Sequence, residues 1–293
     1  MNKWIVGEVE ITRVLEFECP LLDPLELFPN ADKETIEYNK HWLQPTLQDP
    51  NTGLLILSFH SFLIRTPRHL ILVDTCGGND KNRPQKPRYH MNSWPYLENL
   101  EIAKIHPNEI DYVLCTHLHV DHVGWNTRLV NGKWIPTFPN AKYLFSEREW
   151  DFWKEEYLSG EFKDDPYAED SILPIFKFNQ ALLVDDNYQI DDWVGLEPTP
   201  GHTPGHLSVN IRSGPDLAVM SGDIMHHPLQ CLEPDWSSCF CVDPIKSIET
   251  RKRFLATHEK TQALIMPAHF PTPGAGRIIE HGNAYKFNFS EKF

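Results

Sequence analysis

Four side chains that commonly bind metal ions stand close together between Thr116 and Gly124, where the sequence is THLHVDHVG. In an extended chain, residues i and i+2 point to the same side, so His117 and His119 can present two imidazoles to one point. After a turn, Asp121 and His122 can present a carboxylate and an imidazole to a second, adjacent point. Imidazole and carboxylate groups together suit Zn²⁺ and similar cations. The spacing therefore predicts a metal site, and the alternative is a set of surface histidines on a loop.

Three further motifs carry groups of the same kind. Residues 199–206 read TPGHTPGH, and their glycines and prolines fix an unusual backbone that can aim His202. Asp223 follows a strand-like apolar run in the sequence SGD, and His269 follows another such run in the sequence PAH. A metal cleft at the rim of a sheet requires ligands of this kind, far apart in sequence but at strand ends. These motifs weaken the alternative of unrelated surface histidines.

The chain around these motifs predicts two groups of strands, each followed by helices. Strand patterns cover residues 9–15, 54–64, 69–74, 111–116, 142–145, 207–211, 217–221 and 263–267, and helix patterns cover residues 94–100, 147–157 and 244–260. In the last helix, Ile245, Ile248, Phe254 and Leu255 are expected to form the buried face. Such a chain predicts two sheets in contact with helices outside them. Residues 20–52 are interpreted as an ordered excursion that acts as a lid or a dimer-contacting arm.

The order of the motifs resembles that of the metallo-β-lactamase-fold hydrolases over roughly residues 5–270: HxHxDH, a Gly-Pro-rich GH loop, SGD and a strand-final His. The resemblance implies an α/β fold, a four-layer αβ/βα sandwich with two mixed β-sheets packed face to face, formed by residues 1–293 as a single domain. It implies that metal one is held by His117, His119 and His202, metal two by Asp121, His122 and His269, and that Asp223 bridges them. Asp74 matches a family position that supports the ligands, and the alternative is an Asp that only organises a turn.

Within this superfamily, the sequence looks most similar to the N-acyl-homoserine lactonase and methyl-parathion-hydrolase-like group. This resemblance implies a dinuclear metal-dependent hydrolase that opens lactones or cleaves carboxylic esters by attack of a hydroxide bridging the two ions, with promiscuous activity on organophosphates. Asp121 would be both a ligand and the acid/base that moves a proton to the leaving oxygen. The alternatives are a hydrolase of the same fold that acts on β-lactams or phosphoesters, and a metal-binding protein without catalytic activity.

One position departs from the compact lactonases, which place a Tyr three residues after the bridging Asp. His226 stands there in this sequence. We expect it to donate a hydrogen bond to the substrate, and the alternative is a histidine that packs beside the site without touching substrate. Four aromatic residues near the motifs could line an apolar pocket, although each of them by itself is more often a core residue. They are Trp94, Trp125, Trp236 and Phe270.

Composition and charge limit the partners. The 293 residues carry 27 basic and 41 acidic side chains, a net charge of −14, which argues against binding to nucleic acid or to an anionic membrane surface. The sequence shows neither a run of about 18 apolar residues for a membrane helix nor a signal-peptide pattern, so we expect a cytoplasmic location. The six cysteines form no CxxC pair and are expected to be reduced thiols, with Cys76 and Cys115 structural.

The expected cofactors are two divalent metal ions. Zn²⁺ is the first candidate, although the same ligands accept Mn, Fe or Co. The expected partners are a small-molecule substrate and, by resemblance to the group, a second copy of the chain in a homodimer. Cys231, Cys239 and Cys241 stand near one another, but no second half of a zinc-binding pattern accompanies them, so loop and core thiols are favoured.

Overall fold

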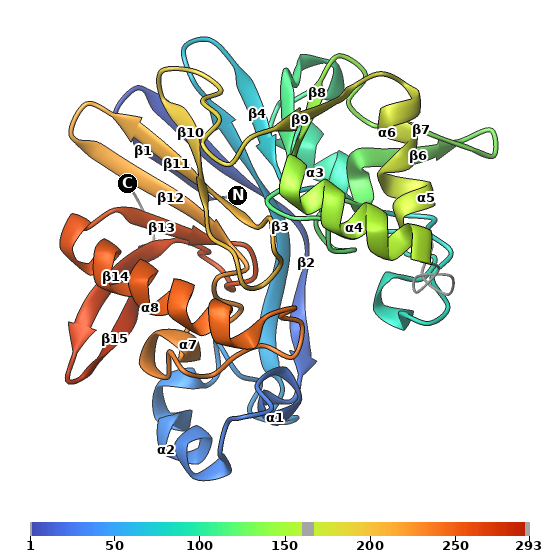
Figure 1. The fold of residues 1–293 in the computed structure, drawn as a ribbon. Helices are drawn as coiled ribbons and strands as arrows, with labels where there is room; N and C mark the ends of the chain where they lie inside the picture. Colours follow the sequence, from blue (N-terminus) through green and yellow to red (C-terminus); the bar gives the residue numbers. More distant parts are fainter. Residues whose placement is uncertain (1, 160–166, 291–293) are drawn as a thin grey trace.

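Two β-sheets packed face to face form the centre of the computed structural model, with helices on the outer sides (Figure 1). The structure describes residues 2–159 and 167–290. The first sheet contains, side by side, β1 (Lys3–Val6), β2 (Val9–Leu22), β3 (Leu55–Arg65), β4 (Leu70–Val73), β5 (Tyr112–Leu114), β8 (Lys142–Ser146) and β9 (Ala181–Val184). The second contains β10 (Val194–Pro198), β11 (Leu207–Ser213), β12 (Asp216–Gly222), β13 (Leu264–Pro267), β14 (Gly276–His281) and β15 (Ala284–Phe289). The predicted four-layer αβ/βα sandwich is confirmed.

Both sheets are mixed, and their parallel pairs matter most for the site. β4 pairs with β5, β5 with β8 and β8 with β9 in parallel in the first sheet, and β12 pairs with β13 in parallel in the second. Parallel strands end at the same edge of a sheet, so the segments that follow β4 and β5 leave side by side, as do those that follow β12 and β13. Every residue predicted to bind metal, apart from His202, follows β5, β12 or β13 directly.

The remaining elements cover the sheets or connect their strands (Figure 1). They are α1 (Pro24–Leu27), α2 (Lys33–Leu43), η1 (Pro87–Tyr89), α3 (Tyr96–Ile102), η2 (Pro107–Glu109), η3 (Gly124–Asn126), β6 (Thr127–Val130), β7 (Lys133–Pro136), α4 (Glu147–Ser159), α5 (Tyr167–Ser171), α6 (Leu173–Lys177), α7 (Leu229–Leu232) and α8 (Pro244–Thr261). α8 begins where the Asp243 side chain accepts a hydrogen bond from the Lys246 amide, with Pro244 in its first turn. Within the described residues, no helix combines the length and the hydropathy that crossing a membrane demands.

Three apolar layers hold the sandwich together. Between the sheets, residues such as Ile64 and Leu114 of the first sheet pack with Val209 and Met266 of the second. A second layer lies between the first sheet and its helices, and a third lies under α8, where Phe254 and the neighbouring Leu255 are buried. Alternating strand residues supply both faces of each sheet, which explains why the strand patterns could be recognised in the sequence.

The structure corrects one predicted helix face and adds strands. Ile245 is 74% exposed, so it does not belong to the buried face of α8. The first turn of α8 lies against the loop that carries His202 and uses the small residues Ser247 and Thr250 for this contact, which turns Ile245 outward. The hairpin of β14 and β15 was not predicted from the sequence, because its strands are interrupted by charged and polar residues.

The excursion at residues 20–52 is ordered and packs on the molecule. β2 continues to Leu22, and α1 and α2 follow it. Their apolar residues join a cluster with Leu229 and Trp236, and the ring nitrogen Nε2 of His227 donates a hydrogen bond to the Leu47 carbonyl at 3.0 Å. The excursion is therefore fixed to the segment that follows Asp223.

Candidate metal centre

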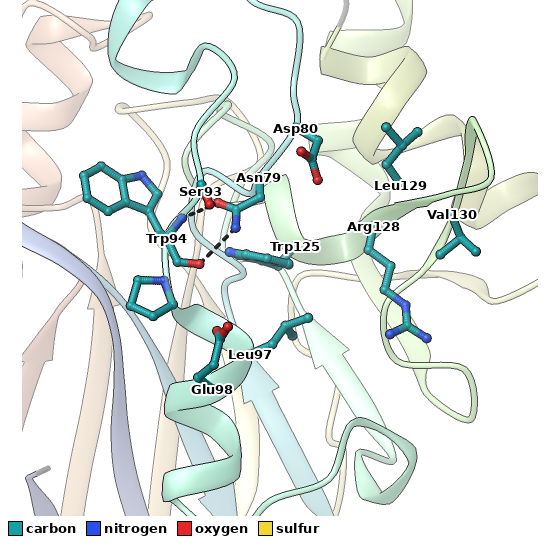
Figure 2. Close-up of a pocket in the computed structure, with 11 residues that line it drawn as sticks. Asn79, Asp80, Ser93, Trp94, Leu97, Glu98, Trp125, Arg128, Leu129 and Val130 are labelled. Carbon is teal, nitrogen blue, oxygen red and sulfur yellow. Dashed lines mark hydrogen bonds between the residues drawn. The ribbon is translucent and has the colours of Figure 1, made fainter.

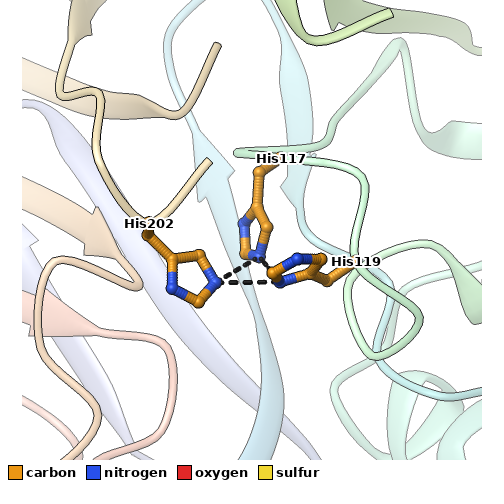
Figure 3. Close-up of side chains that lie close together, drawn as sticks. All are labelled: His117, His119 and His202. Atoms are coloured by element: carbon orange, nitrogen blue, oxygen red, sulfur yellow. Dashed lines mark hydrogen bonds between the residues drawn. The ribbon is translucent and has the colours of Figure 1, made fainter. Parts of the chain in front are cut away.

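Three histidine rings converge on one point (Figure 3). His117 and His119 lie on the loop after β5, and His202 lies on the loop between β10 and β11. Nε2 of His117 is 3.1 Å from Nδ1 of His119, and Nε2 of His202 is 3.1 Å from the first atom and 2.9 Å from the second. Nitrogens around one tetrahedral zinc ion are about 3.3 Å apart, because each Zn–N bond is about 2.0–2.1 Å long. These three nitrogens could therefore hold one cation.

A second group of side chains lies beside the first. Nε2 of His269 is 3.6 Å, and Nε2 of His122 is 4.0 Å, from Oδ2 of Asp121. The carboxylate of Asp223 stands between the two groups. Its Oδ1 is 3.4 Å from Nε2 of His122, and its Oδ2 is 3.2 Å from Nε2 of His202. The structure thus brings all seven predicted ligands together, with one carboxylate placed to face two cations.

The two groups differ in charge. Burial, the largest cause, lowers the pKa of His119 to about 3, although Asp121 and Asp223 raise it. Burial likewise lowers the pKa values of His117 and His202 well below their usual range, so all three rings are neutral. In the second group, burial, the largest single cause, would lower the pKa values of His122 and His269. The charges of Asp223 and Asp121 and, for His269, the hydrogen bond to Asp223, acting together with other neighbours, outweigh burial and raise both pKa values.

The donor set fits metal ions. Nε2 of His122, Oδ1 of Asp223 and both ring nitrogens of His226 are buried without a hydrogen-bond partner. An unpaired buried polar group costs about 1–3 kcal/mol, so several at one place call for a partner from outside the chain. Neutral imidazole nitrogens and carboxylate oxygens are the ligands that zinc and similar divalent cations prefer. The chemistry of these residues therefore fits one cation in each group.

Asp74, which follows β4, orients the second group. Its Oδ1 accepts a hydrogen bond from the Thr116 amide at 2.8 Å, and its Oδ2 accepts one from Nδ1 of His122 at 2.9 Å. The second bond fixes the ring so that Nε2 of His122 faces the other ligands. Asp74 itself has a positive φ of 58°, so it also forms the turn after the strand. Both roles considered for this residue are present in the structure.

His206 was not predicted as a functional residue, although it is the second histidine of the TPGHTPGH motif. Its Nδ1 lies 2.8 Å from Oγ1 of Thr199, and its Nε2 accepts a hydrogen bond from the Asp223 amide at 2.9 Å. Gly222 has a φ of +50°, and a Cβ there would lie only 2.5 Å from Nε2 of His206. His206 therefore fixes the backbone from which the Asp223 carboxylate projects. The repeated GH in the motif was the available signal.

Tyr89 was also missed, because its segment shows no motif. Its hydroxyl donates a hydrogen bond to Oδ2 of Asp121 at 3.3 Å. Burial, followed by the charge of Asp121, raises the pKa of Tyr89 well above its usual value, so the hydroxyl keeps its proton. Oδ2 of Asp121, the oxygen that faces His269, thus accepts a hydrogen bond from a neutral tyrosine hydroxyl.

Glu16 lies beneath this part of the site. It is the extra residue of a β-bulge, since Leu15 and Phe17 pair with consecutive residues of β3. Its carboxylate accepts hydrogen bonds from the amides of Gly77 and Gly78 and from the indole of Trp125. Burial, the largest cause, raises its pKa to about 7 although these donors lower it. Glu16 holds the turn that follows β4, and a bulge is not visible in a single sequence.

A cavity of about 580 Å³ opens onto the candidate ligands. Its polar wall includes Asp121, Asp223, His226 and Tyr89. Its apolar wall is formed mainly by Leu21, Leu22, Leu57, Phe59 and Phe240. Nε2 of His226 is 3.2 Å from Oδ2 of Asp223 and borders the cavity. The arrangement can take a small molecule with an apolar part and a polar group directed at the ligands.

The four aromatic residues considered as a lining do not line this cavity, and the interpretation as core residues is the one that the structure supports. The walls of this cavity, as far as the described residues form them, do not include Trp94, Trp125, Trp236 or Phe270. Trp94 stacks on Phe17 with 4.7 Å between the ring centroids, and the other three are buried in the apolar clusters. Trp94 and Trp125 border a different cavity of about 390 Å³ beside β6 (Figure 2). Large rings near the motifs serve packing, because burying them stabilises the core.

The cysteines play no part in either ligand group. Burial raises the pKa values of Cys76 and Cys115 well above their usual range, so both thiols stay protonated. Cys231 is buried and Cys239 is exposed, and neither joins a cluster of potential ligands among the described residues. Sγ of Cys241 lies 3.6 Å from Nδ1 of His202.

The comparisons with known proteins agree with this geometry. The chain is 30% identical over 231 residues to the N-acyl homoserine lactonase AttM of Azorhizobium caulinodans. This alignment covers 72% of this chain and 81% of that protein. It is 27% identical over 231 residues to AttM of Agrobacterium fabrum, with the same coverage of 72% and 81%.

Solved structures share the whole fold. The hydrolase AbOPH of the beta lactamase superfamily superposes with a TM-score of 0.82 and 25% identity, over 99% of this chain and 98% of that one. AidC, a dizinc quorum-quenching lactonase, superposes with a TM-score of 0.78 and 22% identity, over 99% and 97% of the two chains. The sequence profile of the metallo-beta-lactamase superfamily matches residues 59–278. The resemblance read from the motifs is confirmed, and the chain belongs to the metallo-beta-lactamase superfamily.

Proposed function

We propose that this protein is a dinuclear metal-dependent hydrolase that opens lactones of the N-acyl-homoserine type. The observation that carries the proposal is the seven-residue ligand set at the base of a cavity with an apolar wall. An N-acyl-homoserine lactone has a small polar ring and an apolar chain, which match the two walls of this cavity. The named lactonases among the relatives support the same substrate class.

In this proposal the two groups of ligands each hold one cation. His117, His119 and His202 would hold the first, and Asp121, His122 and His269 would hold the second, with Asp223 between them. When bound, the two cations would polarise the substrate carbonyl and make a coordinated water a better nucleophile at neutral pH. Zinc is the metal we propose, because imidazole nitrogens dominate the set and the histidines of the first group are neutral.

Three residues of the chain would act on the substrate or its protons. Asp121 would accept a proton from the attacking water and pass it to the alcohol oxygen that leaves when the ring opens. Tyr89 would keep the Asp121 carboxylate in place through its 3.3 Å hydrogen bond. His226 would donate a hydrogen bond to the substrate, since it borders the cavity and neither of its ring nitrogens has a hydrogen-bond partner among the described residues.

A substrate panel tests the proposal. Purified protein, analysed first for metal content, would be assayed with hexanoyl-homoserine lactone, an aryl ester, a phosphotriester and a cephalosporin. We expect ring opening of the lactone to be the fastest reaction, with a smaller activity on the ester. Faster hydrolysis of the cephalosporin or of the phosphotriester would overturn the assignment of the substrate class. Protein that has been loaded with zinc and still hydrolyses none of the substrates would overturn the hydrolase proposal.

A homodimeric state and a cytoplasmic location are part of the same proposal. The six cysteines are free in the structure, which supports a reducing compartment. The resemblance to the lactonase group supports the homodimer. Light scattering on the purified protein measures its mass, and a value for one chain of 34.0 kDa would contradict the homodimer.

A further inference from the structure

A buried carboxylate outside the ligand set joins the two loops that carry the first group of histidines. Glu149, in the first turn of α4, is 1% exposed. Its Oε1 accepts a hydrogen bond from the Leu118 amide at 3.0 Å, and its Oε2 accepts one from the Gly205 amide at 2.9 Å. Leu118 stands between His117 and His119, and Gly205 follows three residues after His202. The carboxylate of Glu149 therefore connects the loop that carries His117 and His119 with the loop that carries His202.

This carboxylate has only neutral partners. Within the described residues, Glu149 forms no ion pair with Lys or Arg, and its third bond comes from the indole Nε1 of Trp153. A buried carboxylate is costly unless hydrogen bonds satisfy it, so a residue of this kind is retained where its bonds hold something in place. The ring of Trp153 also contacts His119, with 5.3 Å between the centroids.

The loop around His202 is fixed by close contacts as well. A Cβ at Gly205 would lie 2.2 Å from the backbone nitrogen of Glu149, and a Cβ at Gly201 would lie 2.3 Å from the backbone nitrogen of Ser247. Only glycine permits such approaches, so the loop lies against the first turns of both α4 and α8. His202 thus projects from a loop whose position depends on Glu149 on one side.

The second group has a different support. Asp74 bonds to Nδ1 of His122 and to the amide and hydroxyl of Thr116. The Thr116 hydroxyl oxygen lies 3.1 Å from Nδ1 of His117, but no bond of Asp74 within the described residues reaches the loop that carries His202. Within the described residues, Glu149 bonds to Leu118, Trp153 and Gly205 and to none of the second-group ligands Asp121, His122 and His269. Of these two buried carboxylates, Glu149 bonds to the loop that carries His202, and Asp74 bonds to a ligand of the second half.

We propose that Glu149 is a positioning residue for the half of the site formed by His117, His119 and His202, and that it sets the affinity of this half for metal independently of the other half. The proposal rests on the proposed two-metal function. A Gln at this position offers one acceptor oxygen and one NH₂ group, and the NH₂ group cannot accept a bond from an amide. Whichever way it is turned, one of the two loops loses its acceptor.

The test compares the variant Glu149→Gln with Glu147→Gln, which makes the same chemical change on an exposed residue of the same helix turn. Both proteins are equilibrated with zinc buffers over a range of free zinc, and bound zinc is measured by mass spectrometry. We expect one of the two ions to bind about 10–100-fold more weakly in Glu149→Gln, with the other unchanged. Glu147→Gln is expected to bind both ions as the unaltered protein does.

Ligand variants assign the effect to one half. In a His269→Ala background, which retains the triad, Glu149→Gln should weaken the remaining ion by the same factor. In a His202→Ala background it should have little effect on the remaining ion. Equal weakening of both ions, or no weakening at all, would overturn the inference. If the unaltered protein binds no zinc, cobalt, manganese or iron, the proposed function fails and not this inference alone.

A second variant protects the test against misfolding. Circular dichroism of the metal-free proteins shows whether Glu149→Gln folds. If it does not, Trp153→Phe decides, because it removes the indole donor to Oε1 and keeps an aromatic ring. We expect Trp153→Phe to weaken the same single ion by a smaller factor. An unchanged zinc affinity in that variant would count against the inference.

Discussion

The two halves of the candidate metal centre are built on different principles. The first consists of three neutral imidazoles that come from two loops, and its support is a carboxylate on a helix. The second combines a carboxylate with two imidazoles of raised pKa, and its support is a carboxylate at a strand end. In the second half the hydroxyl of Tyr89 donates a hydrogen bond to the carboxylate of Asp121, whereas in the first half the hydroxyl of Thr116 lies 3.1 Å from the ring nitrogen Nδ1 of His117. This difference supports the proposal that the first half mainly holds a cation, while the second also handles protons.

We expect the largest loss of activity when Asp223, which lies between the two halves, is substituted. Asp223→Ala takes away the carboxylate that lies 3.2–3.4 Å from nitrogens of both halves. We expect lactone hydrolysis to fall about 10³-fold or more, because metal stabilisation of the reacting groups is worth several kcal/mol. Initial rates and metal content are the measurements. Asp216→Ala, at the exposed start of the same strand, is the control, and a fully active Asp223→Ala protein would contradict the shared role.

We expect the next largest effect, a loss of metal affinity, when Asp74, which supports the second half, is substituted. Asp74→Asn removes a carboxylate oxygen from the contact with Nδ1 of His122. We expect about 10–100-fold weaker binding of one metal ion, as for other partners of metal-binding histidines. In a His202→Ala background, where the second half is the one retained, the loss should persist. Zinc titration against a chelator measures it, and a loss that vanishes in that background would show that the halves share one support.

Acid should act on the two halves in opposite directions in the metal-free protein. The pKa of His119 falls from 6.5 to about 3 on folding, so the unfolded chain binds the proton first. Its contribution to the free energy of unfolding is therefore lost as the pH falls from about 6.5 toward 3. His269 has a raised pKa, so its contribution is complete below 6.5 and is lost as the pH rises through the folded value.

Urea unfolding of chelator-treated protein at several pH values tests this contrast. His119→Gln should reduce the loss of stability on the acid side. His269→Gln should reduce stability most on the acid side, where the native ring is charged beside Asp223. Parallel pH profiles for the two variants would contradict the difference in charge between the halves.

The smallest effect is expected for the hydroxyl of Tyr89. Tyr89→Phe removes one hydrogen bond to Asp121 and keeps the ring. A hydrogen bond to a charged group contributes about 1.5–3 kcal/mol at most, and this one is long, so we expect kcat to fall about fivefold with little change in KM. Steady-state kinetics with the lactone measure kcat and KM for the variant. Tyr38→Phe, which alters an exposed tyrosine of α2, is the control, and an increase in KM alone would indicate a role in binding rather than in proton transfer.

The ligands could be predicted because local sequence determines where they project. His117 and His119 follow a short strand, and Asp223 and His269 follow others, so strand patterns and ligand types coincide. Glu149 and Glu16 could not be predicted, since each acts through backbone amides of segments that are remote in sequence. Only the folded chain shows which amides they meet.

Tertiary packing also explains where the sequence misled, at the aromatic residues near the motifs and at one residue of α8. Trp94 and Trp125 stand near the motifs in sequence, but their rings pack against Phe17 and Tyr96 rather than beside the ligands. Ile245 fits an apolar helix face by its spacing, but small residues make the contact there instead. Spacing identifies the faces of an element, and tertiary packing decides which of these faces is used.

Residues 20–52 form part of the cavity wall, so a substitution in this segment and a substitution of a candidate ligand should have different consequences. Leu21 and Leu22 border the cavity, yet they belong to a segment that contributes no ligand. If the proposed lactonase activity holds, substitutions at these two positions should change which acyl chains fit the cavity and leave the candidate ligands in place. The hydrogen bond from His227 to the Leu47 carbonyl ties that segment to the stretch just after Asp223, so the apolar wall keeps its position relative to the candidate ligands while its own side chains vary.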